Sequence, residues 1–290
     1  MVDRTPAASP LYDRIGRGYA AYRRPEPRIA ARIAAALGDA RSVVNVGAGA
    51  GSYEPEDREV VAVEPSGEMV RQRAGDAAPA VRGRAEQLPF RDRAFDAAMA
   101  ILTIHHWTDV ARGLAEMRRV ARERVVILTW DPEHPGFWLV RNYFPEIHEF
   151  DRRTFPSLET LRAAFGPIEV HPVPVPADCV DGFLGAYWRR PEAYLDEGAR
   201  GAISSFPRLN NVEARIARVR ADLAGGTWHA RNADLLALDE LDIGYRLVVA
   251  AGPRDSSTIT ATLNELYATE SSALDSDLRA AQSRLFRESW

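Results

Sequence analysis

The feature that most constrains this chain is a glycine-rich turn between two apolar runs. The first run, Val43–Val46, predicts a buried parallel strand, because strands covered on both faces are almost continuously apolar. Three glycines occupy alternate positions directly after it: Gly47, Gly49 and Gly51. They predict a turn whose backbone lies close to a ligand. The second run, Val60–Val63, ends on Glu64, and a carboxylate at that place can accept both hydroxyls of a ribose. The two runs together predict a site for an adenosine-containing cofactor.

The segment after the glycines distinguishes two kinds of adenosine cofactor. The dinucleotide fingerprint is G-x-G-x-x-G, and its third glycine packs a long helix on the strand. Here the third glycine comes one position early, and Ser52–Arg58 is too short and too proline-broken for a crossover helix. A pyrophosphate usually needs that helix N-terminus, whereas S-adenosylmethionine carries no phosphate. The spacing therefore favours S-adenosylmethionine.

Motifs further along the chain reveal a resemblance to a known family. The loop Ala85–Phe90 precedes a fourth apolar strand, Ala97–Ile101, which runs into His105, His106 and Trp107. This order resembles class I S-adenosylmethionine-dependent methyltransferases, in the branch similar to the ubiquinone/menaquinone-biosynthesis enzymes. Over roughly residues 10–252 the resemblance implies an α/β fold with a Rossmann-like, doubly wound, seven-stranded sheet. It also implies methyl transfer from S-adenosyl-L-methionine to a small-molecule acceptor.

The resemblance further implies which residues bind the cofactor. They are Tyr19, Arg23, Gly47, Gly49, Gly51, Glu64, Ala85, Glu86, Ile101 and Leu102. Among them, Glu64 would accept the ribose hydroxyls, Ala85 and Glu86 would border the adenine, and Arg23 would pair with the cofactor's carboxylate through its planar guanidinium. One position departs from the family pattern, because Asn45 stands where the family usually has aspartate.

Candidate catalytic and acceptor residues lie beyond the fourth strand. Methyl transfer requires alignment of two reactants and, for some acceptors, removal of a proton. His105 is the candidate base, since histidine titrates near neutral pH. Alternatively, the histidines hydrogen-bond backbone and brace the next helix. The candidate substrate-binding residues are Tyr12, His106, Trp130, Asp181 and Tyr187.

The order of elements predicts the rest of the fold. Helices over 27–37 and 109–121 alternate with the strands, a pattern typical of a parallel α/β sheet. We expect a strand over 168–175 and an antiparallel last strand over 245–251, which the family places at the end of the sheet. Two stretches, about 131–157 and 178–238, interrupt this rhythm and are predicted to be mainly helical insertions that form a lid over the cofactor. Within the second, the acids and aromatic residues of 178–190 form either a substrate wall or a capped helix with a core-facing aromatic side.

Composition and charge limit the function classes. The formal net charge is −4, and all 37 basic residues are arginine, which argues against a nucleic-acid substrate. The one cysteine, Cys179, excludes an internal disulfide and a cysteine-rich zinc site, so no metal is expected. Met1–Pro10 lacks the apolar core of a signal peptide, and no apolar run reaches the roughly 20 residues that span a bilayer. We expect a cytoplasmic protein.

The last segment, 253–290, predicts a linker followed by a helical tail. Its leucines and terminal Glu288–Trp290 resemble the C-terminal segment of antitoxins from type II toxin–antitoxin pairs. That resemblance implies a protein partner; the alternative is a helix that docks on its own domain or on a second copy. A second functional hypothesis is therefore a cofactor-binding or degenerate module whose tail engages a partner.

Overall fold

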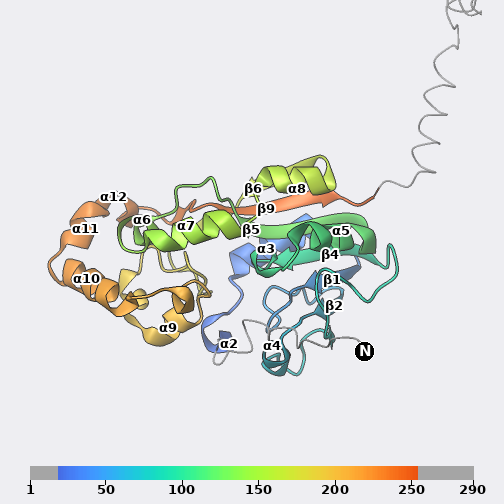
Figure 1. Cartoon of the computed structure of the whole chain (residues 1–290), viewed down its shortest axis with the longest axis horizontal. Coiled ribbons are helices and arrows are strands. Elements are labelled where there is room, and N and C mark those ends of the chain that lie inside the picture. Colours follow the sequence, from blue (N-terminus) through green and yellow to red (C-terminus); the bar gives the residue numbers. More distant parts are fainter. Residues whose placement is uncertain (1–18, 254–290) are drawn as a thin grey trace, which may run out of the picture. The chain divides into compact units, whose positions relative to one another are not determined.

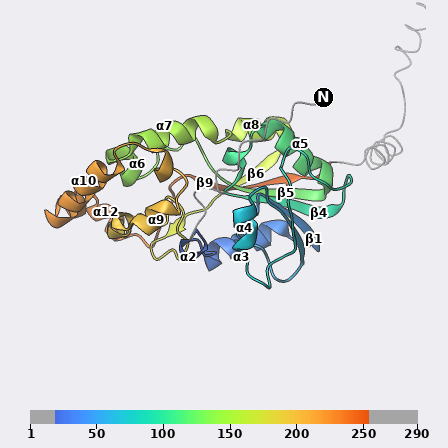
Figure 2. The same ribbon diagram turned by 60° about the horizontal axis from the view of Figure 1, so that its bottom comes forward.

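The chain forms a seven-stranded sheet covered by helices on both faces (Figures 1 and 2). A computed structural model describes residues 19–253, with side chains from residue 21 onward. The strands are β1 (Ser42–Val46), β2 (Glu59–Val63), β3 (Ala80–Val81), β4 (Phe95–Ile101), β5 (Ala121–Trp130), β6 (Ile168–Pro172) and β9 (Tyr245–Ala251). Their order across the sheet is β3-β2-β1-β4-β5-β9-β6. This arrangement confirms the predicted Rossmann-like, doubly wound fold.

The last strand, β9, lies inside the sheet. It pairs antiparallel with β5 on one side and with β6 on the other, whereas β1 to β5 pair in parallel. The antiparallel direction is confirmed, but the edge position is wrong, since β6 forms the edge. Side-chain burial explains this order: Leu247, Val248 and Ala250 of β9 are buried, while Glu169 and His171 of β6 are exposed.

Two hydrophobic cores lie on opposite faces of the sheet. Helix α3 (Pro27–Leu37) begins at the N-cap Glu26 and buries Ile29, Ile33 and Leu37 against one face. Helices α5 (Val110–Val120) and α8 (Leu158–Phe165) cover the other face. Neighbouring strand residues alternate between the two cores, as Val43 and Val44 do, because successive strand side chains point to opposite faces.

The two predicted insertions lie side by side beyond one end of the sheet (Figures 1 and 2). The first holds α6 (Trp138–Asn142) and α7 (Pro145–Thr154); the second holds η2 (Pro191–Leu195), α9 (Glu197–Gly201), η3 (Phe206–Arg208), α10 (Val212–Ala224), α11 (Thr227–Arg231) and α12 (Ala233–Leu236). Aromatic side chains join them, because the ring of Trp138 meets those of Tyr194 and Trp228 edge-on. The second insertion begins after β7 (Val175–Pro176) and ends before β8 (Glu240–Leu241), and these two strands pair antiparallel.

The helix proposed for residues 178–190 does not form. This stretch consists of tight turns, with hydrogen bonds from the Ala186 N–H to the Phe183 carbonyl and from the Arg190 N–H to the Tyr187 carbonyl. Two glycines explain the difference. A Cβ on Gly182 would lie 2.5 Å from the Tyr22 carbonyl oxygen, and one on Gly185 would lie 1.9 Å from Ile243 Cδ1. Close packing at these two glycines therefore determines the conformation of residues 178–190, and the helical spacing of the aromatic residues does not.

Two further predictions concern membrane spans and the C-terminal tail. Within residues 19–253 no helix has both the length and the apolar composition needed to cross a membrane. The chain divides into two compact units at Gly252–Pro253, and the predicted tail lies almost entirely outside the described residues. The tail and its partner therefore stay predictions.

Candidate active site

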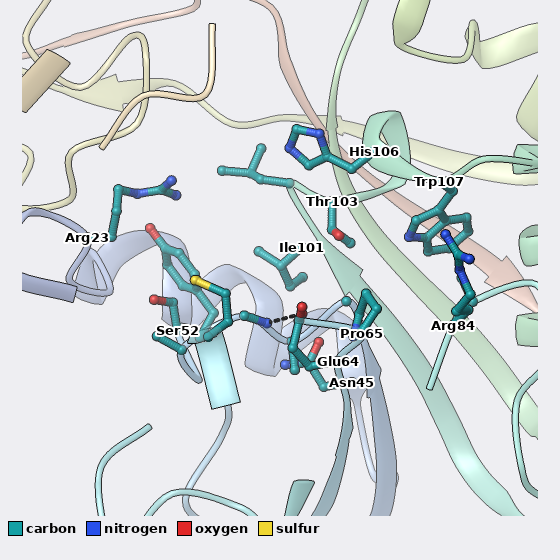
Figure 3. Close-up of a pocket in the computed structure, with 18 of the residues that line it drawn as sticks. Arg23, Asn45, Ser52, Glu64, Pro65, Arg84, Ile101, Thr103, His106 and Trp107 are labelled. Carbon is teal, nitrogen blue, oxygen red and sulfur yellow. Dashed lines mark hydrogen bonds between the residues drawn. The ribbon is translucent and has the colours of Figure 1, made fainter. Parts of the chain in front are cut away.

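A cavity of about 270 Å³ opens where β1, β2 and β4 end (Figure 3). We call it the glycine-loop cavity. Eight of the ten residues predicted to bind cofactor line it: Arg23, Gly47, Gly49, Glu64, Ala85, Glu86, Ile101 and Leu102. The side chain of Tyr19 is not described, and Gly51 is not among the lining residues. Parallel strands bring these residues together because their carboxyl ends share one edge.

Gly47 makes the sharp turn out of β1. Its φ is +75°, and its N–H donates to the carbonyl of Val63 at 2.8 Å. A Cβ at this position would lie 2.2 Å from Thr103 Oγ1, so no larger residue fits without moving Thr103. The absence of a side chain leaves the cavity open beside the backbone.

Glu64 holds the glycine loop from the end of β2. Its side-chain oxygens accept hydrogen bonds from the backbone N–H groups of Gly49 and Ser66, both at 2.8 Å. The first of these bonds is the dashed line in Figure 3. The residue is 5% exposed and lines the cavity. A carboxylate fixed in this way presents its remaining lone pairs to a ligand's hydroxyls.

A buried ion pair lies beside the glycine loop. Asn45 Nδ2 donates to Glu54 Oε1 at 3.0 Å, and Arg73 Nη2 lies 2.6 Å from Glu54 Oε2. Gly51 packs beside this pair, with φ at +96° and its N–H bonded to the Ala48 carbonyl. Glu54 thus supplies the carboxylate missing at position 45. Sequence reasoning missed this role, because Glu54 lies in the irregular crossover, where residues 47–58 form turns as predicted.

The far end of the glycine-loop cavity is bounded by the 84–86 loop. Ala85 is buried, and Glu86 accepts hydrogen bonds from the N–H groups of Thr108 and Asp109 at 2.8 and 3.2 Å. Glu86 therefore ties the loop to the start of α5. Arg84 and Trp107 also line this end, away from Arg23 (Figure 3).

Arg23 lies at the near end and is held by Asp181. Arg23 Nε lies 2.7 Å from Asp181 Oδ1, and the Tyr53 hydroxyl donates to Asp181 Oδ2 at 2.7 Å. The N–H of Gly182 donates to the same carboxylate at 2.6 Å. Asp181 is fully buried and lines neither cavity, and its contacts position Arg23 and Tyr53. Its role in substrate binding stays a prediction.

A second cavity, of about 70 Å³, adjoins the first and shares Arg23 and Leu102 with it. We call it the aromatic cavity. Rings and apolar side chains from the sheet and both insertions dominate its wall: Trp130, Phe137, Val140, Phe155, Phe183 and Tyr245. Of the residues predicted to bind substrate, Trp130 lines the aromatic cavity and His106 lines the glycine-loop cavity. Tyr187 lines neither cavity, and its ring packs against that of Tyr194. Tyr12 lies outside the described residues.

Two titratable groups on the aromatic cavity differ in the direction of their pKa shifts. Burial lowers the pKa of His105 well below its usual value, and His106 and Arg208 add to the effect. His105 stacks on Phe155, with ring centroids 3.9 Å apart. Burial raises the pKa of Asp151 to about 7, although Arg208 opposes the shift. The role of His105 as the catalytic base stays a prediction. Its lowered pKa makes the His105 side chain a weak base at neutral pH.

Asp151 was missed by sequence reasoning. It is 8% exposed, sits on α7 and lines the aromatic cavity. A signal was present, because Asp151 follows Ile147 by four residues and therefore shares its buried face. An acid on the apolar face of a helix is a candidate functional group.

Comparison with known proteins agrees with this geometry. Residues 44–129 match the family described as "Methyltransferase domain". A putative methyltransferase from an antibiotic biosynthesis pathway of Anabaena variabilis is 33% identical, with a TM-score of 0.73, covering 79% of this chain and 98% of that one. The chain is 32% identical to rice 2-methyl-6-phytyl-1,4-hydroquinone methyltransferase 2 over 125 residues, which cover 37% of this chain and 36% of that protein. Demethylmenaquinone methyltransferase of Deinococcus radiodurans is 28% identical over 68% of this chain and 78% of its own length.

The chain belongs to the class I S-adenosylmethionine-dependent methyltransferases, and its cofactor is S-adenosyl-L-methionine. The glycine-loop cavity fits this molecule. Glu64 offers a fixed carboxylate for ribose hydroxyls, Arg23 offers a cation for the methionine carboxylate, and Ile101 offers an apolar surface. The turn formed by residues 47–58 lacks the helix N-terminus that a pyrophosphate would need, as expected for a cofactor without phosphate.

Proposed function

We propose that this enzyme methylates a small aromatic acceptor bound in the aromatic cavity. The observation that carries this proposal is the sharing of Arg23 and Leu102 by the two cavities. Bound S-adenosyl-L-methionine supplies an electrophilic methyl group. Arg23 and Glu64 then orient it, while Phe155 and Trp130 hold a flat acceptor beside it and exclude water.

The size of the aromatic cavity limits what enters it. A volume of about 70 Å³ holds several waters, since one water needs about 10–15 Å³ by this measure. We infer that the reacting ring of the acceptor enters this space and that the rest extends toward solvent. The names of two relatives support an aromatic acceptor, because both the rice and the Deinococcus proteins are named for quinone-type compounds. We also infer a cytoplasmic location, in keeping with the buried free thiol of Cys179.

A labelled-methyl assay tests the proposal. The enzyme is incubated with cofactor carrying a radioactive methyl group and with hydroquinones, naphthols, total RNA or lysate protein. We expect label in a hydroxylated aromatic and none in RNA or protein. Labelling of RNA or protein alone would overturn the proposal.

A pair of phenylalanine variants locates the acceptor. Phe155 lines the aromatic cavity, whereas Phe90 lines neither cavity and packs on Phe95; both are partly buried. We expect Phe155→Ala to raise the acceptor KM about tenfold, in the range of lost apolar pocket contacts, and to leave the cofactor Kd unchanged. Phe90→Ala should leave the acceptor KM unchanged. Equal effects of the two variants would place the acceptor elsewhere.

A further inference from the structure

Asp151 is a buried acid that the fold itself does not use. It is 8% exposed, and among the residues that the structure describes no donor forms a hydrogen bond with its carboxylate. A buried carboxylate without donors is costly, so such groups are rare unless they have a function. Asp151 lines the aromatic cavity, where a hydroxyl group of the methyl acceptor would supply the missing hydrogen-bond donor.

The contrast with Asp181 separates a functional acid from a structural one. Asp181 is fully buried and receives hydrogen bonds from Arg23, Tyr53 and Gly182. Its charge is therefore fully compensated within the protein. In the part of the chain that the structure describes, Asp151 has no ion pair, and the positive charge of Arg208, which lies over the ring of Phe150, influences it only electrostatically. The hydrogen-bond donors of Asp181 all come from the protein, whereas the carboxylate of Asp151 can still accept a hydrogen bond from a ligand.

We propose that Asp151 binds the hydroxyl group of an aromatic acceptor and takes its proton during methyl transfer. This inference rests on the proposed function and names its acceptor chemistry. The acceptor's O–H bond breaks and its proton moves to Asp151. The oxygen then forms the new bond to the methyl carbon. On an alternative route a ring carbon that the deprotonated oxygen activates forms this bond, and that carbon then loses its hydrogen as a proton, which the oxygen takes back. The sulfur–methyl bond breaks and its electron pair stays on sulfur, giving S-adenosylhomocysteine. Asp151 afterwards releases the proton to solvent.

The protonation behaviour of the cavity favours Asp151 over His105 as the base. A base works best when its pKa lies near the working pH. The pKa of Asp151 is raised to about 7, whereas that of His105 is far below its usual value, so His105 holds a proton poorly. Arg208 from η3 and Tyr245 from β9 interact electrostatically with Asp151. The other charged or titratable groups that line the same cavity are Arg23, His105, and His148 from the same helix as Asp151. His148 Nε2 lies 3.0 Å from the carbonyl oxygen of His134 and, as an N–H, donates to it.

A binding experiment tests this assignment without turnover. Phenol and its methyl ether anisole are titrated into enzyme saturated with S-adenosylhomocysteine at pH 8. A hydrogen bond to a charged group is stronger than one to a neutral group, so we expect wild type to prefer phenol by about tenfold or more. That preference should fall below about threefold in Asp151→Asn and in wild type at pH 5, where Asp151 is protonated and the hydrogen bond loses its charge. Glu149→Gln removes an exposed acid from the same helix and should keep the preference.

The outcomes are separable. An unchanged preference in Asp151→Asn, or no preference in wild type, overturns the role of Asp151. Loss of S-adenosylhomocysteine binding in the variant would reveal misfolding, and the pH dependence of wild type then decides alone. The proposed function fails on a different result, namely the absence of methyl transfer to any hydroxylated aromatic.

Turnover gives a second test once an acceptor is found. We expect Asp151→Asn to lower kcat about 100-fold or more, in the range of lost general-base catalysis, with the cofactor Kd unchanged. The acid limb of the kcat profile, near pH 7 in wild type, should vanish. A kcat within threefold of wild type with the same limb would overturn the proposal. Mass analysis of the product distinguishes an O-methyl from a C-methyl group.

Discussion

Arg23 and Asp181 form a buried ion pair that joins the N-terminal segment to the second insertion across 158 residues of sequence. The Arg23 side chain is 10% exposed and that of Asp181 is fully buried. Because Arg23 lines both cavities, this pair connects the glycine-loop cavity with the aromatic cavity. The position of the insertion and the position of the cofactor's cationic partner are therefore mechanically linked.

The first prediction concerns Asp181. Replacing it with alanine removes a buried carboxylate that both Arg23 and Tyr53 contact, which should destabilise the fold by about 3–5 kcal/mol and weaken cofactor binding. Urea unfolding and calorimetry measure the two effects. Asp178→Ala is the matched control, because Asp178 is exposed and its ion pair is with the exposed Arg28. Equal stability of the two variants would contradict the assigned role.

The second prediction concerns Glu64. In Glu64→Gln the amide can accept from only one of the Gly49 and Ser66 N–H groups, because its nitrogen is a donor. We expect cofactor affinity to fall about tenfold, or about 1.4 kcal/mol. Glu59→Gln, at the exposed start of the same strand, should bind cofactor like wild type. Calorimetry that finds the same Kd for both variants would refute this use of Glu64.

The third prediction concerns Gly47. Alanine there combines an unfavourable φ of +75° with a contact of 2.2 Å to Thr103, which must move into the cavity. We expect at least a tenfold loss of cofactor affinity. Gly166→Ala is the control, since its φ of +82° is also strained but its Cβ meets nothing within 4 Å. That variant should lose about 1–3 kcal/mol of stability from strain alone and keep its cofactor affinity.

The fourth prediction is a pH dependence of stability that Asp151 controls. Its pKa is raised from 3.8 to about 7 in the folded state, so the folded protein holds this proton more tightly than the unfolded chain. The resulting stability is complete below pH 3.8 and is lost as the pH rises through 7. Between pH 5 and 8 wild type should lose about 2–3 kcal/mol relative to Asp151→Asn. Buried neutral histidines act in the opposite direction but cancel in this comparison.

Denaturation of both proteins across that pH range measures the difference. Glu149→Gln should follow wild type, because Glu149 is exposed. Parallel stability curves for wild type and Asp151→Asn would contradict the raised pKa of Asp151.

The sheet and the glycine-loop cavity were predictable because their signals are local. Val43–Val46 and Gly47 lie in one continuous run, and the carboxyl ends of parallel strands must meet at one edge. The aromatic cavity was only partly predictable, since Trp130 comes from a strand end while Phe183 and Tyr245 reach it through tertiary packing. Helical spacing misled at 178–190, because two glycines there pack against Tyr22 and Ile243, and no periodicity reports such contacts.

The roles of polar side chains were harder to predict than those of apolar side chains. Asp178 and Asp181 are three residues apart and alike in sequence, yet one is exposed and the other is fully buried. Glu54 carried no sequence signal, since its role depends on partners from distant segments. Helical spacing placed Asp151 on a buried face but could not show that its carboxylate has no hydrogen-bond donor. Only the folded arrangement distinguishes these acids.

The two cavities draw on almost separate stretches of the chain. The glycine-loop cavity is lined by residues between Arg23 and Thr108, whereas apart from Arg23, Leu102 and His105 the aromatic cavity is lined by residues between Trp130 and Tyr245. Exchange of the later stretch between relatives would therefore replace the acceptor-facing wall and leave the nucleoside-binding half intact. In evolutionary terms, such a chain can diversify in what it modifies while its source of methyl groups stays constant.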